Sequence, residues 1–508
     1  MTDTPPSRVR PVTDPQGPTG RLAIWLAEVP FDHIPALVRE RAKYLLLDGL
    51  GCALVGAQLP WSRTAVESVT RFEGRGEKTI IGWGKTTSAP AAALLNGTFI
   101  QGFELDDYHP LAPLHSASLI LPALLACAEE IGRVEGKQFL RAAILGCEIG
   151  PRVGMALHGA QMLSRGWHSG PVFGTFASAA AVGALLGLDP AGFEDALGLA
   201  GTQSAGLMAA QYESMGKRMH HGFSSRNGLY AAFLASAGYT GIKRVFEREY
   251  GGFLSTFGEG HEPDASQIND GLGKRWETER IVVKPYAAQG ALHAALDALF
   301  TLFAQYSFRP EDVARIDIDL SKAAYHHGWW QVERPLTPIG AQMNIAYSVA
   351  VALLDGAAMI QQYTPQRIAQ EDVWELIPKI TARHEPEFDA SRITQGHTRM
   401  RITLADGTRL ETFQAMPRTI QQPLSNDKIV AKFRTLTREI VNAERQARIE
   451  HLVLHIEEEV DVRELCQVLA SPVGAVFAEG ENKDESKAGG KTDEQTSCGQ
   501  ASPWYPRR

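Results

Sequence analysis

The sequence predicts a mainly α-helical protein in which both ends of the chain form a large all-helical domain and a smaller α+β domain is inserted between them. Three observations lead to this fold class. Apolar segments with glycine-containing breaks alternate from residue 21 to about residue 251, β-strand periodicity appears after about residue 271, and a helical pattern returns near Ser425. A chain of 508 residues is too long for one compact core, so we expect more than one domain.

The first helical region contains segments such as "RAKYLLLDGLGCALVGA" and "AGFEDALGLAGTQSAGLMAA". Asp189 and Pro190 precede the second segment as an N-cap and a first-turn residue. The apolar run Phe176–Leu188 is shorter than the roughly 18 residues that suggest a membrane span, and it is rich in alanine and glycine. Small residues let helices approach one another, so we expect a buried helix in a packed helical body and no membrane partner.

The inserted domain combines strands with helices. The segment "VARIDIDLS" alternates apolar and polar residues, and "RMRITLADGTRLETFQ" contains two alternating runs joined through Asp406-Gly407, a favoured hairpin turn. Helical stretches such as "GALHAALDALFTLFAQ" lie between the strand-like runs. We therefore predict a flexible leader over residues 1–20, a helical domain over residues 21–271 and 421–475, an α+β lid domain over residues 272–420 and a disordered tail over residues 479–508.

The two ends of the chain have polar compositions. The first 20 residues lack the apolar core of a secretory signal, and Asp3 and Asp14 interrupt the sparse arginines that a mitochondrial presequence needs. We therefore expect a cytoplasmic protein. The tail from Glu479 is nearly free of apolar residues, which favours disorder.

The overall composition is that of a soluble globular protein, with 44% hydrophobic and 21% charged residues. The formal net charge is -8, and no basic cluster exceeds a pair or triplet, which argues against nucleic acid as the main partner. Five scattered cysteines indicate reduced thiols inside a cell, and they form no zinc or iron–sulfur ligand pattern.

Four segments concentrate polar residues within apolar sequence. The first, "FELDDYHPLAPLHSAS", contains adjacent acids and two histidines. In "SRGWHSGPVFG" the histidine His168 stands between glycines before an apolar helix, and "MGKRMHHGFSSRNG" combines cationic residues with two histidines. In "IVVKPYAAQGALH", Lys284 follows an apolar run and precedes a proline, so we expect it to be partly buried and to need an anionic partner.

Other interpretations of these residues are open. His109, His220 and His221, taken singly, resemble surface or satisfied core histidines, and the pair Asp106-Asp107 could cap a helix. A metal site at the first segment is disfavoured, because two prolines prevent His109 and His115 from sharing a helix face. Ser116 lacks the turn of a serine nucleophile, and phosphate-binding loops are missing from the sequence. With these kinds of site set aside, the residues favour acid/base chemistry without a cofactor. The substrate would be one that binds to cationic side chains.

The sequence resembles the MmgE/PrpD family, and most closely its fungal cis-aconitate decarboxylases. The resemblance rests on segments that run in order from about Arg21 to about Ala470, among them "FELDDYHPLAPLHSASLILPALLA", "GWHSGPVFGTFASAA", "KRMHHGFSSRNG", "VKPYAAQGALHAALDAL" and "ERPLTPIGAQMNIAYSVAVALLD". It implies a helical domain built from both chain ends, an inserted α+β lid domain, a homodimer and an active site between the two domains.

The resemblance also implies which residues form the site. The family keeps its site residues at the positions matched here by His115, His168, Lys217 and Lys284, and the acids of "ELDD", Asp106 and Asp107 among them, line the same pocket in relatives. Animal decarboxylases of the family have a histidine just past the lid lysine and a tyrosine ahead of an "RP" pair. In this chain Gln289 and Gln331 occupy those neighbourhoods, and Tyr325 is a candidate replacement for the tyrosine.

The implied reaction removes CO2 from cis-aconitate, a tricarboxylate, and yields itaconate without metal or cofactor. Lys217 and Lys284 would hold the carboxylates, and His115 or His168 would deliver a proton to the resulting carbanion, with His115 the favoured acid. The alternative is a hydro-lyase of the same family that acts on 2-methylcitrate, for which we expect "HPSD" where this chain has "HSAS". A non-catalytic tricarboxylate-binding protein is a further alternative.

Overall fold

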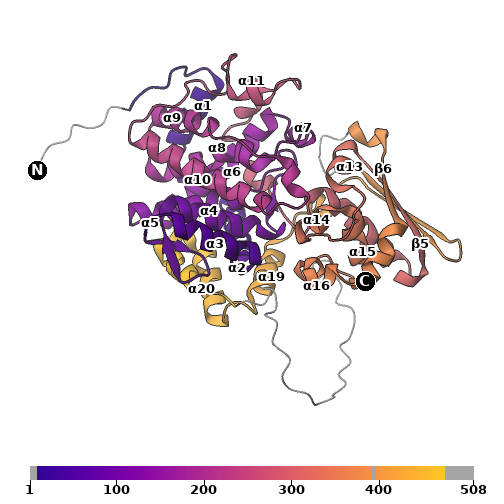
Figure 1. Ribbon diagram of the computed structural model, residues 1–508. Helices are drawn as coiled ribbons and strands as arrows, with labels where there is room; N and C mark the ends of the chain where they lie inside the picture. Colours follow the sequence, from indigo (N-terminus) through magenta and orange to yellow (C-terminus); the bar gives the residue numbers. More distant parts are fainter. Residues whose placement is uncertain (1–8, 391–395, 475–508) are drawn as a thin grey trace, which may run out of the picture.

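The computed structural model describes residues 9–390 and 396–474 and shows two domains side by side (Figure 1). The larger, helical domain contains the first half of the chain together with the C-terminal helices. The smaller α+β domain contains the chain between them. This mainly helical architecture with one small mixed sheet confirms the predicted fold class.

The first helix of the helical domain begins at Pro18, and the helices of its first part run through residue 257. Two short antiparallel ribbons, β1 with β2 and β3 with β4, complete it. The helices and strands of this part are α1 (Pro18–Glu28), α2 (Ala36–Ala57), α3 (Pro60–Phe72), β1 (Lys78–Ile80), β2 (Lys85–Thr87), α4 (Ala89–Ile100), β3 (Asp107–Tyr108), α5 (Ser116–Ile131), α6 (Gly136–Ala156), α7 (Gly159–Ser164), α8 (Ser169–Leu186), α9 (Pro190–Gly201), α10 (Gly216–Ser236), α11 (Phe253–Phe257) and β4 (Val282–Val283).

Helix α8 is the core of this domain. It is long and apolar enough to cross a membrane, but 89% of it is buried, and it packs between α6 and α10. Small residues allow the close approach: Gly174 lies against Leu119 of α5, and a side-chain carbon at Gly228 of α10 would lie 2.3 Å from Ser178 of α8. The predicted buried helix is therefore confirmed. The predicted cap is confirmed as well, because the Asp189 side chain accepts a hydrogen bond from the Gly192 N–H at the start of α9.

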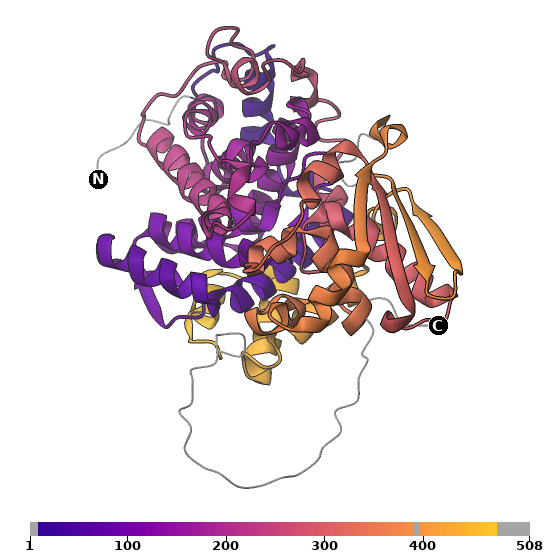
Figure 2. The same ribbon diagram turned by 45° about the vertical axis from the view of Figure 1, so that its right-hand side comes forward.

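The α+β domain has a four-stranded sheet in the order β6-β5-β7-β8, in which β5 and β6 are parallel and the other neighbours are antiparallel. Helices lie between the sheet and the helical domain (Figure 2). The predicted hairpin joins β7 to β8, and Gly407 at its turn has a φ of 89°, which favours glycine. The elements are α12 (His293–Gln305), β5 (Val313–Leu320), α13 (Lys322–Gly328), α14 (Pro338–Met343), α15 (Ile345–Asp355), α16 (Pro365–Ile368), α17 (Glu371–Leu376), β6 (Ile380–His384), β7 (Thr398–Leu404), β8 (Arg409–Gln414) and α18 (Arg418–Gln421).

The chain then returns to the helical domain, as its sequence predicts. Helices α19 (Asn426–Thr437), α20 (Ala443–Leu454) and α21 (Arg463–Ala470) follow the last strand. Helix α19 packs along α2, where Lys432 forms a fully buried ion pair with Asp48 at 2.7 Å. The Lys432 ammonium group also donates a hydrogen bond of 2.6 Å to the carbonyl of Leu105. The C-terminal helices thus support the segment that contains the "ELDD" acids.

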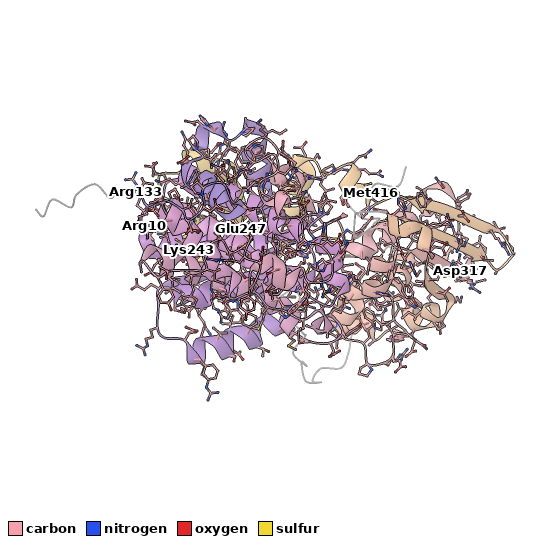
Figure 3. The ribbon with its side chains drawn as sticks, turned by 90° about the horizontal axis from the view of Figure 1, so that it is seen from above. Arg10, Arg133, Lys243, Glu247, Asp317 and Met416 are labelled. Carbon is pink, nitrogen blue, oxygen red and sulfur yellow. The ribbon has the colours of Figure 1, made fainter. Side chains whose placement is uncertain are left out.

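The leader differs from its prediction, and the tail is untested. The predicted tail, residues 479–508, and residues 1–8 lie outside the described residues. From residue 9 the chain packs on the start of α9: the Arg10 guanidinium pairs with Asp189 at 3.0 Å, and Thr13 donates to Glu194. Figure 3 shows Arg10 at the same end of the molecule as Lys243 and Glu247, opposite Asp317 on the sheet. The helical domain therefore includes residues that composition assigns to a flexible leader, because carboxylates distant in sequence bind them.

Candidate active site

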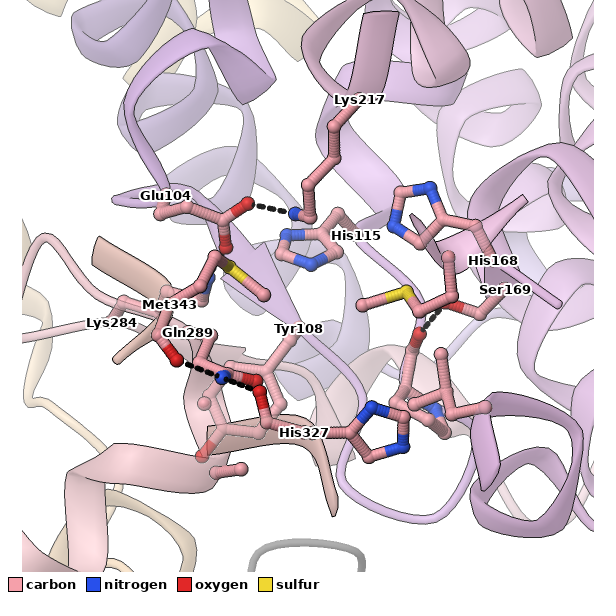
Figure 4. Close-up of a pocket in the computed structure, with 15 residues that line it drawn as sticks. Glu104, Tyr108, His115, His168, Ser169, Lys217, Lys284, Gln289, His327 and Met343 are labelled. Carbon is pink, nitrogen blue, oxygen red and sulfur yellow. Dashed lines mark hydrogen bonds and ion pairs between the residues drawn. The ribbon is translucent and has the colours of Figure 1, made fainter. Parts of the chain in front are cut away.

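A cavity lies where the two domains meet, and it brings together five of the predicted site residues. His115, His168 and Lys217 reach it from the helical domain, and Lys284 and Gln289 reach it from the segment that leads into the α+β domain (Figure 4). The empty space measures about 510 Å³, part of it open to solvent.

Glu104 is at the centre of the charged side of this cavity. Its carboxylate pairs with the ammonium group of Lys217 and, at 3.0 Å, with that of Lys284. Burial alone would raise the pKa of Glu104, but the charges of Lys217 and Lys284 outweigh burial and hold that pKa well below its ordinary value. The three side chains are almost fully buried, so the cavity contains two ammonium groups around one carboxylate.

Three separate elements position this cluster. Glu104 ends the short turn after α4 with a φ of 54°, a left-handed conformation that is uncommon outside glycine. Lys217 is in the first turn of α10, and Lys284 directly follows β4, which pairs with β3. The prediction that Lys284 is buried and has an anionic partner is confirmed. Glu104 was among the acids of the first segment, but its sequence context did not mark it as this partner.

His115 is held by one of the two adjacent acids. Its Nδ1 lies 3.0 Å from Oδ1 of the buried Asp106, at the N-terminus of α5. A carboxylate only accepts hydrogen bonds, so Nδ1 donates the hydrogen and Nε2 is left for the cavity. This orientation suits a group that exchanges a proton with a ligand.

Asp106 and Asp107, which the resemblance places along the pocket as substrate-binding residues, lie behind the described cavity lining. Both are fully buried, and the cavity lining described by the structure includes neither. Asp107 accepts the N–H groups of Ser116 and Ala117 at 3.2 and 3.1 Å, and its pKa is raised well above the ordinary value by burial and by the charge of Asp106. The acid pair therefore supports the site from behind: Asp106 orients His115, and Asp107 caps the helix that begins beside it.

His168 belongs to a group of adjacent imidazoles. Its Nδ1 lies 2.8 Å from Nδ1 of His220, and its ring stacks on that of His221 with centroids 5.3 Å apart. Burial, together with the charge of Lys217, holds the pKa of His168 well below its ordinary value, and burial lowers that of His220 to about 4. His221 is anchored by Ser118, whose Oγ lies 2.7 Å from its Nδ1. His220 and His221 therefore fix His168, a role that neither residue suggests when taken singly.

The segment that leads into the α+β domain contributes Gln289, and the α+β domain contributes His327 and places Tyr325 elsewhere. Gln289 lines the cavity, but its amide nitrogen donates to the carbonyls of His327 and Met343 at 2.6 and 2.7 Å. Tyr325 is outside the described lining and packs against the apolar core. Helix α13 places His327, two positions further along, in the cavity lining, and substrate binding by Tyr325 stays a prediction. Sequence reasoning missed His327, although the motif "AYHHG" beside Tyr325 was the available signal.

The other histidine of the opening segment has a structural partner. His109 Nε2 lies 3.1 Å from Glu277, and its Nδ1 accepts the N–H of Ala112, so it does not share a ligand with His115. Within residues 9–390 and 396–474, no group of three or more His, Cys, Asp or Glu side chains is arranged to hold a metal ion.

The four described cysteines are buried, and burial raises the pKa of Cys127 to about 12.

This arrangement can bind an anion with several carboxylates and move a proton. Lys217 and Lys284 offer charge-assisted hydrogen bonds, each contributing about 1.5–3 kcal/mol when buried. His115 and His168 place imidazole groups beside them, and imidazole is the side chain best suited to proton transfer near neutral pH.

Comparison with known proteins identifies the family of this chain. Residues 20–266 match the MmgE/PrpD N-terminal domain, and residues 286–458 match the MmgE/PrpD C-terminal domain. The chain is 45% identical over 478 residues to a cis-aconitate decarboxylase-like protein of Aspergillus oryzae, covering 90% of this chain and 99% of the relative. It is 41% identical over 476 residues to a cis-aconitate decarboxylase of Aspergillus terreus, covering 90% and 96%. It is 26% identical over 459 residues to the human cis-aconitate decarboxylase, covering 87% and 92%. The chain therefore belongs to the MmgE/PrpD family.

Proposed function

We propose that the protein converts cis-aconitate to itaconate and CO2 by acid/base catalysis, without metal or cofactor. The observation that supports this most directly is the buried cluster of Lys217, Glu104 and Lys284 beside His115. The cluster has two cationic side chains and one anionic side chain, an excess of positive groups that favours an anionic ligand. The similarity to fungal decarboxylases over 90% of the chain identifies the ligand class.

The two lysines provide the binding energy in this proposal. Cis-aconitate carries three carboxylates, and removing them from water requires hydrogen bonds to cations. Lys217 and Lys284 lie on one wall of the cavity and would each hold a carboxylate, while Glu104 pairs with both ammonium groups and keeps them in place. The carboxylate that departs as CO2 cannot keep an ion pair with a lysine. We therefore propose that this carboxylate binds away from Lys217 and Lys284.

Proton delivery is the second part of the proposal. When the C–C bond to the departing carboxylate breaks, its electron pair forms an allylic carbanion, and CO2 leaves. The far end of the allyl unit then takes a proton, which completes itaconate. We assign this proton to Nε2 of His115 in its imidazolium form: Nδ1–H stays hydrogen-bonded to Asp106, Nε2–H gives its proton to the carbanion, and the ring is left neutral.

Two further proposals concern the whole protein. We propose that it is a homodimer, since Tyr230 and Leu234 expose apolar side chains one turn apart on α10 and family members are usually dimers. We also propose a cytoplasmic location, for which the composition of the chain is the support. Light scattering after size-exclusion chromatography tests the first, and a fluorescent fusion in the source cells tests the second.

A panel of substrates tests the proposed reaction. Purified protein without added metal is incubated with cis-aconitate and, separately, with 2-methylcitrate, and the products are followed by proton NMR. We expect itaconate and CO2 from the first substrate and no change in the second. Loss of water from 2-methylcitrate with no product from cis-aconitate would establish the hydro-lyase instead, and binding of both without any product would indicate a non-catalytic protein. His115→Ala should reduce itaconate formation by about 10²-fold or more, and near-normal turnover would rule out His115 as the acid.

A further inference from the structure

His327 lies at the boundary between the two domains. It is near the end of α13, which packs against α7 of the helical domain and against the turn that precedes α12. Its side chain is only 4% exposed, and it lines the same cavity as Glu104 and Lys217 (Figure 4). The α+β domain therefore adds an imidazole to a site whose other imidazoles all belong, within the described residues, to the helical domain.

The position of His327 is fixed through its backbone. The Gln289 amide nitrogen donates a 2.6 Å hydrogen bond to the His327 carbonyl and a 2.7 Å hydrogen bond to the carbonyl of Met343. The start of α13 is capped by Ser321, whose hydroxyl accepts the N–H of Ala324. A side chain on such a supported backbone is pre-organised, which is the condition for a useful ligand contact.

The ring itself is incompletely satisfied. Among the described residues, Nε2 of His327 is buried without a hydrogen-bond partner. A buried polar atom without a partner is rare in native proteins, because its lost hydration is not replaced. Burial, with the charges of His326 and Lys217, lowers the pKa of His327 to about 4, so the ring is neutral at pH 7 before a ligand arrives. The polar cavity that it lines is where a partner atom can come from.

We propose that His327 binds a carboxylate of the tricarboxylate substrate from the side of the α+β domain, and thereby sets substrate affinity. This inference rests on the proposed function for the class of ligand. A neutral imidazole donates one hydrogen bond, and an approaching polyanion favours the protonated ring with two donors. Binding would thus join the two domains through one ligand, with Lys217 and Lys284 on one side and His327 on the other.

The adjacent histidine offers a matched control. His326 is on the same helix and is exposed, so His326→Gln changes the same residue type without reaching the cavity. His327→Phe keeps a ring of similar size and removes both nitrogens, and His327→Gln keeps a hydrogen-bonding side chain. Circular dichroism and thermal midpoints establish that each variant folds. If His327→Phe fails to fold, His327→Leu, which also removes both nitrogens, decides the outcome by the same Kd and KM criteria.

Two measurements test the proposal. The Kd of tricarballylate, a saturated tricarboxylate that cannot follow the proposed reaction, is measured by calorimetry, and kcat and KM are measured with cis-aconitate. We expect His327→Phe to raise both Kd and KM by roughly tenfold or more, with a smaller change in kcat, and His326→Gln to match the unmodified protein. A Kd within about twofold of the unmodified protein, or no tricarballylate binding to the unmodified protein, would overturn the proposal. If His327→Phe raises the Kd of tricarballylate as expected but the unmodified protein forms no itaconate, the role of His327 is supported and only the proposed reaction is rejected.

Discussion

At the scale of single residues, Glu104 pairs with two ammonium groups in a buried cavity. Desolvation disfavours every charge in the cluster, and the mutual attraction of Glu104 with Lys217 and Lys284 offsets it. Burial lowers the pKa of Lys217, and the carboxylate of Glu104 opposes that change. Glu104 therefore controls the protonation of Lys217 and, with it, the affinity of the cavity for anions.

Replacing Glu104 should change the pH range of activity. In Glu104→Gln the opposing charge is lost, the pKa of Lys217 falls further, and the lysine loses its proton at a lower pH. The alkaline limb of kcat/KM for cis-aconitate should therefore move to lower pH, and kcat/KM at pH 7 should fall by about tenfold or more. Glu104→Asp keeps the charge and is the control. An alkaline limb that is unchanged in Glu104→Gln would refute this role.

Residue-level prediction from the sequence succeeded where the requirement is local. The partial burial of Lys284 could be inferred from the apolar run Ile281–Val283 directly before it and the proline directly after it, and the side chain is buried. Its partner Glu104 is 180 positions away, and no sequence pattern connects the two. For the same reason the acid pair was assigned to the pocket wall, whereas Asp107 caps α5 and Asp106 orients His115.

At the scale of elements, a second buried network joins α6 to the turn before β4. Glu148 of α6 accepts the backbone N–H groups of Glu277 and Thr278, each at 2.9 Å. Burial would raise the pKa of Glu277, but the hydrogen bond from His109 and the charges of nearby arginines outweigh burial and lower it to about 2. The network fixes the chain that runs from the turn into Lys284, so it links packing in the helical domain to the site.

This network makes stability depend on pH in a defined direction. Because the pKa of Glu277 is lower in the folded state, its contribution is present above about pH 4.5 and is lost as the pH falls towards 2. Glu277→Gln should cost about 3 kcal/mol at pH 7, and the difference from the unmodified protein should shrink at pH 3. Urea unfolding at both pH values measures it, and the exposed Glu279→Gln serves as the control. An equal difference at both pH values would contradict the assignment.

At the scale of the whole molecule, the fold class could be predicted because helices and strands have different apolar periods. The insertion and the return of the chain near Ser425 follow from changes in that period, and α19 confirms the return by packing on α2. The leader could not be predicted, because the partners of Arg10 and Thr13 are carboxylates on α9, more than 170 positions away. The position of His327 in the cavity lining could not be predicted either, because it depends on the contact between α13 and α7 of the other domain.

The ion pair between Asp48 and Lys432 connects α2 to α19, two helices of the helical domain that are far apart in the sequence. Both side chains are fully buried, and Lys432 also donates to the Leu105 carbonyl beside Glu104. Lys432→Met should lower the free energy of unfolding by about 3–5 kcal/mol, since it leaves Asp48 buried without its partner. The double variant Asp48→Leu/Lys432→Met should recover most of that loss, as measured by urea unfolding. Additive losses in the double variant would show that the two residues are not energetically coupled.

The central claim is that this cavity removes CO2 with an allylic shift and a proton supplied by the protein. The most direct measurement is NMR of the product formed from cis-aconitate in D2O. We predict itaconate with one deuterium on its saturated methylene carbon, together with CO2. A methyl-substituted isomer, deuterated at the carbon that lost CO2, or unchanged cis-aconitate would contradict the account.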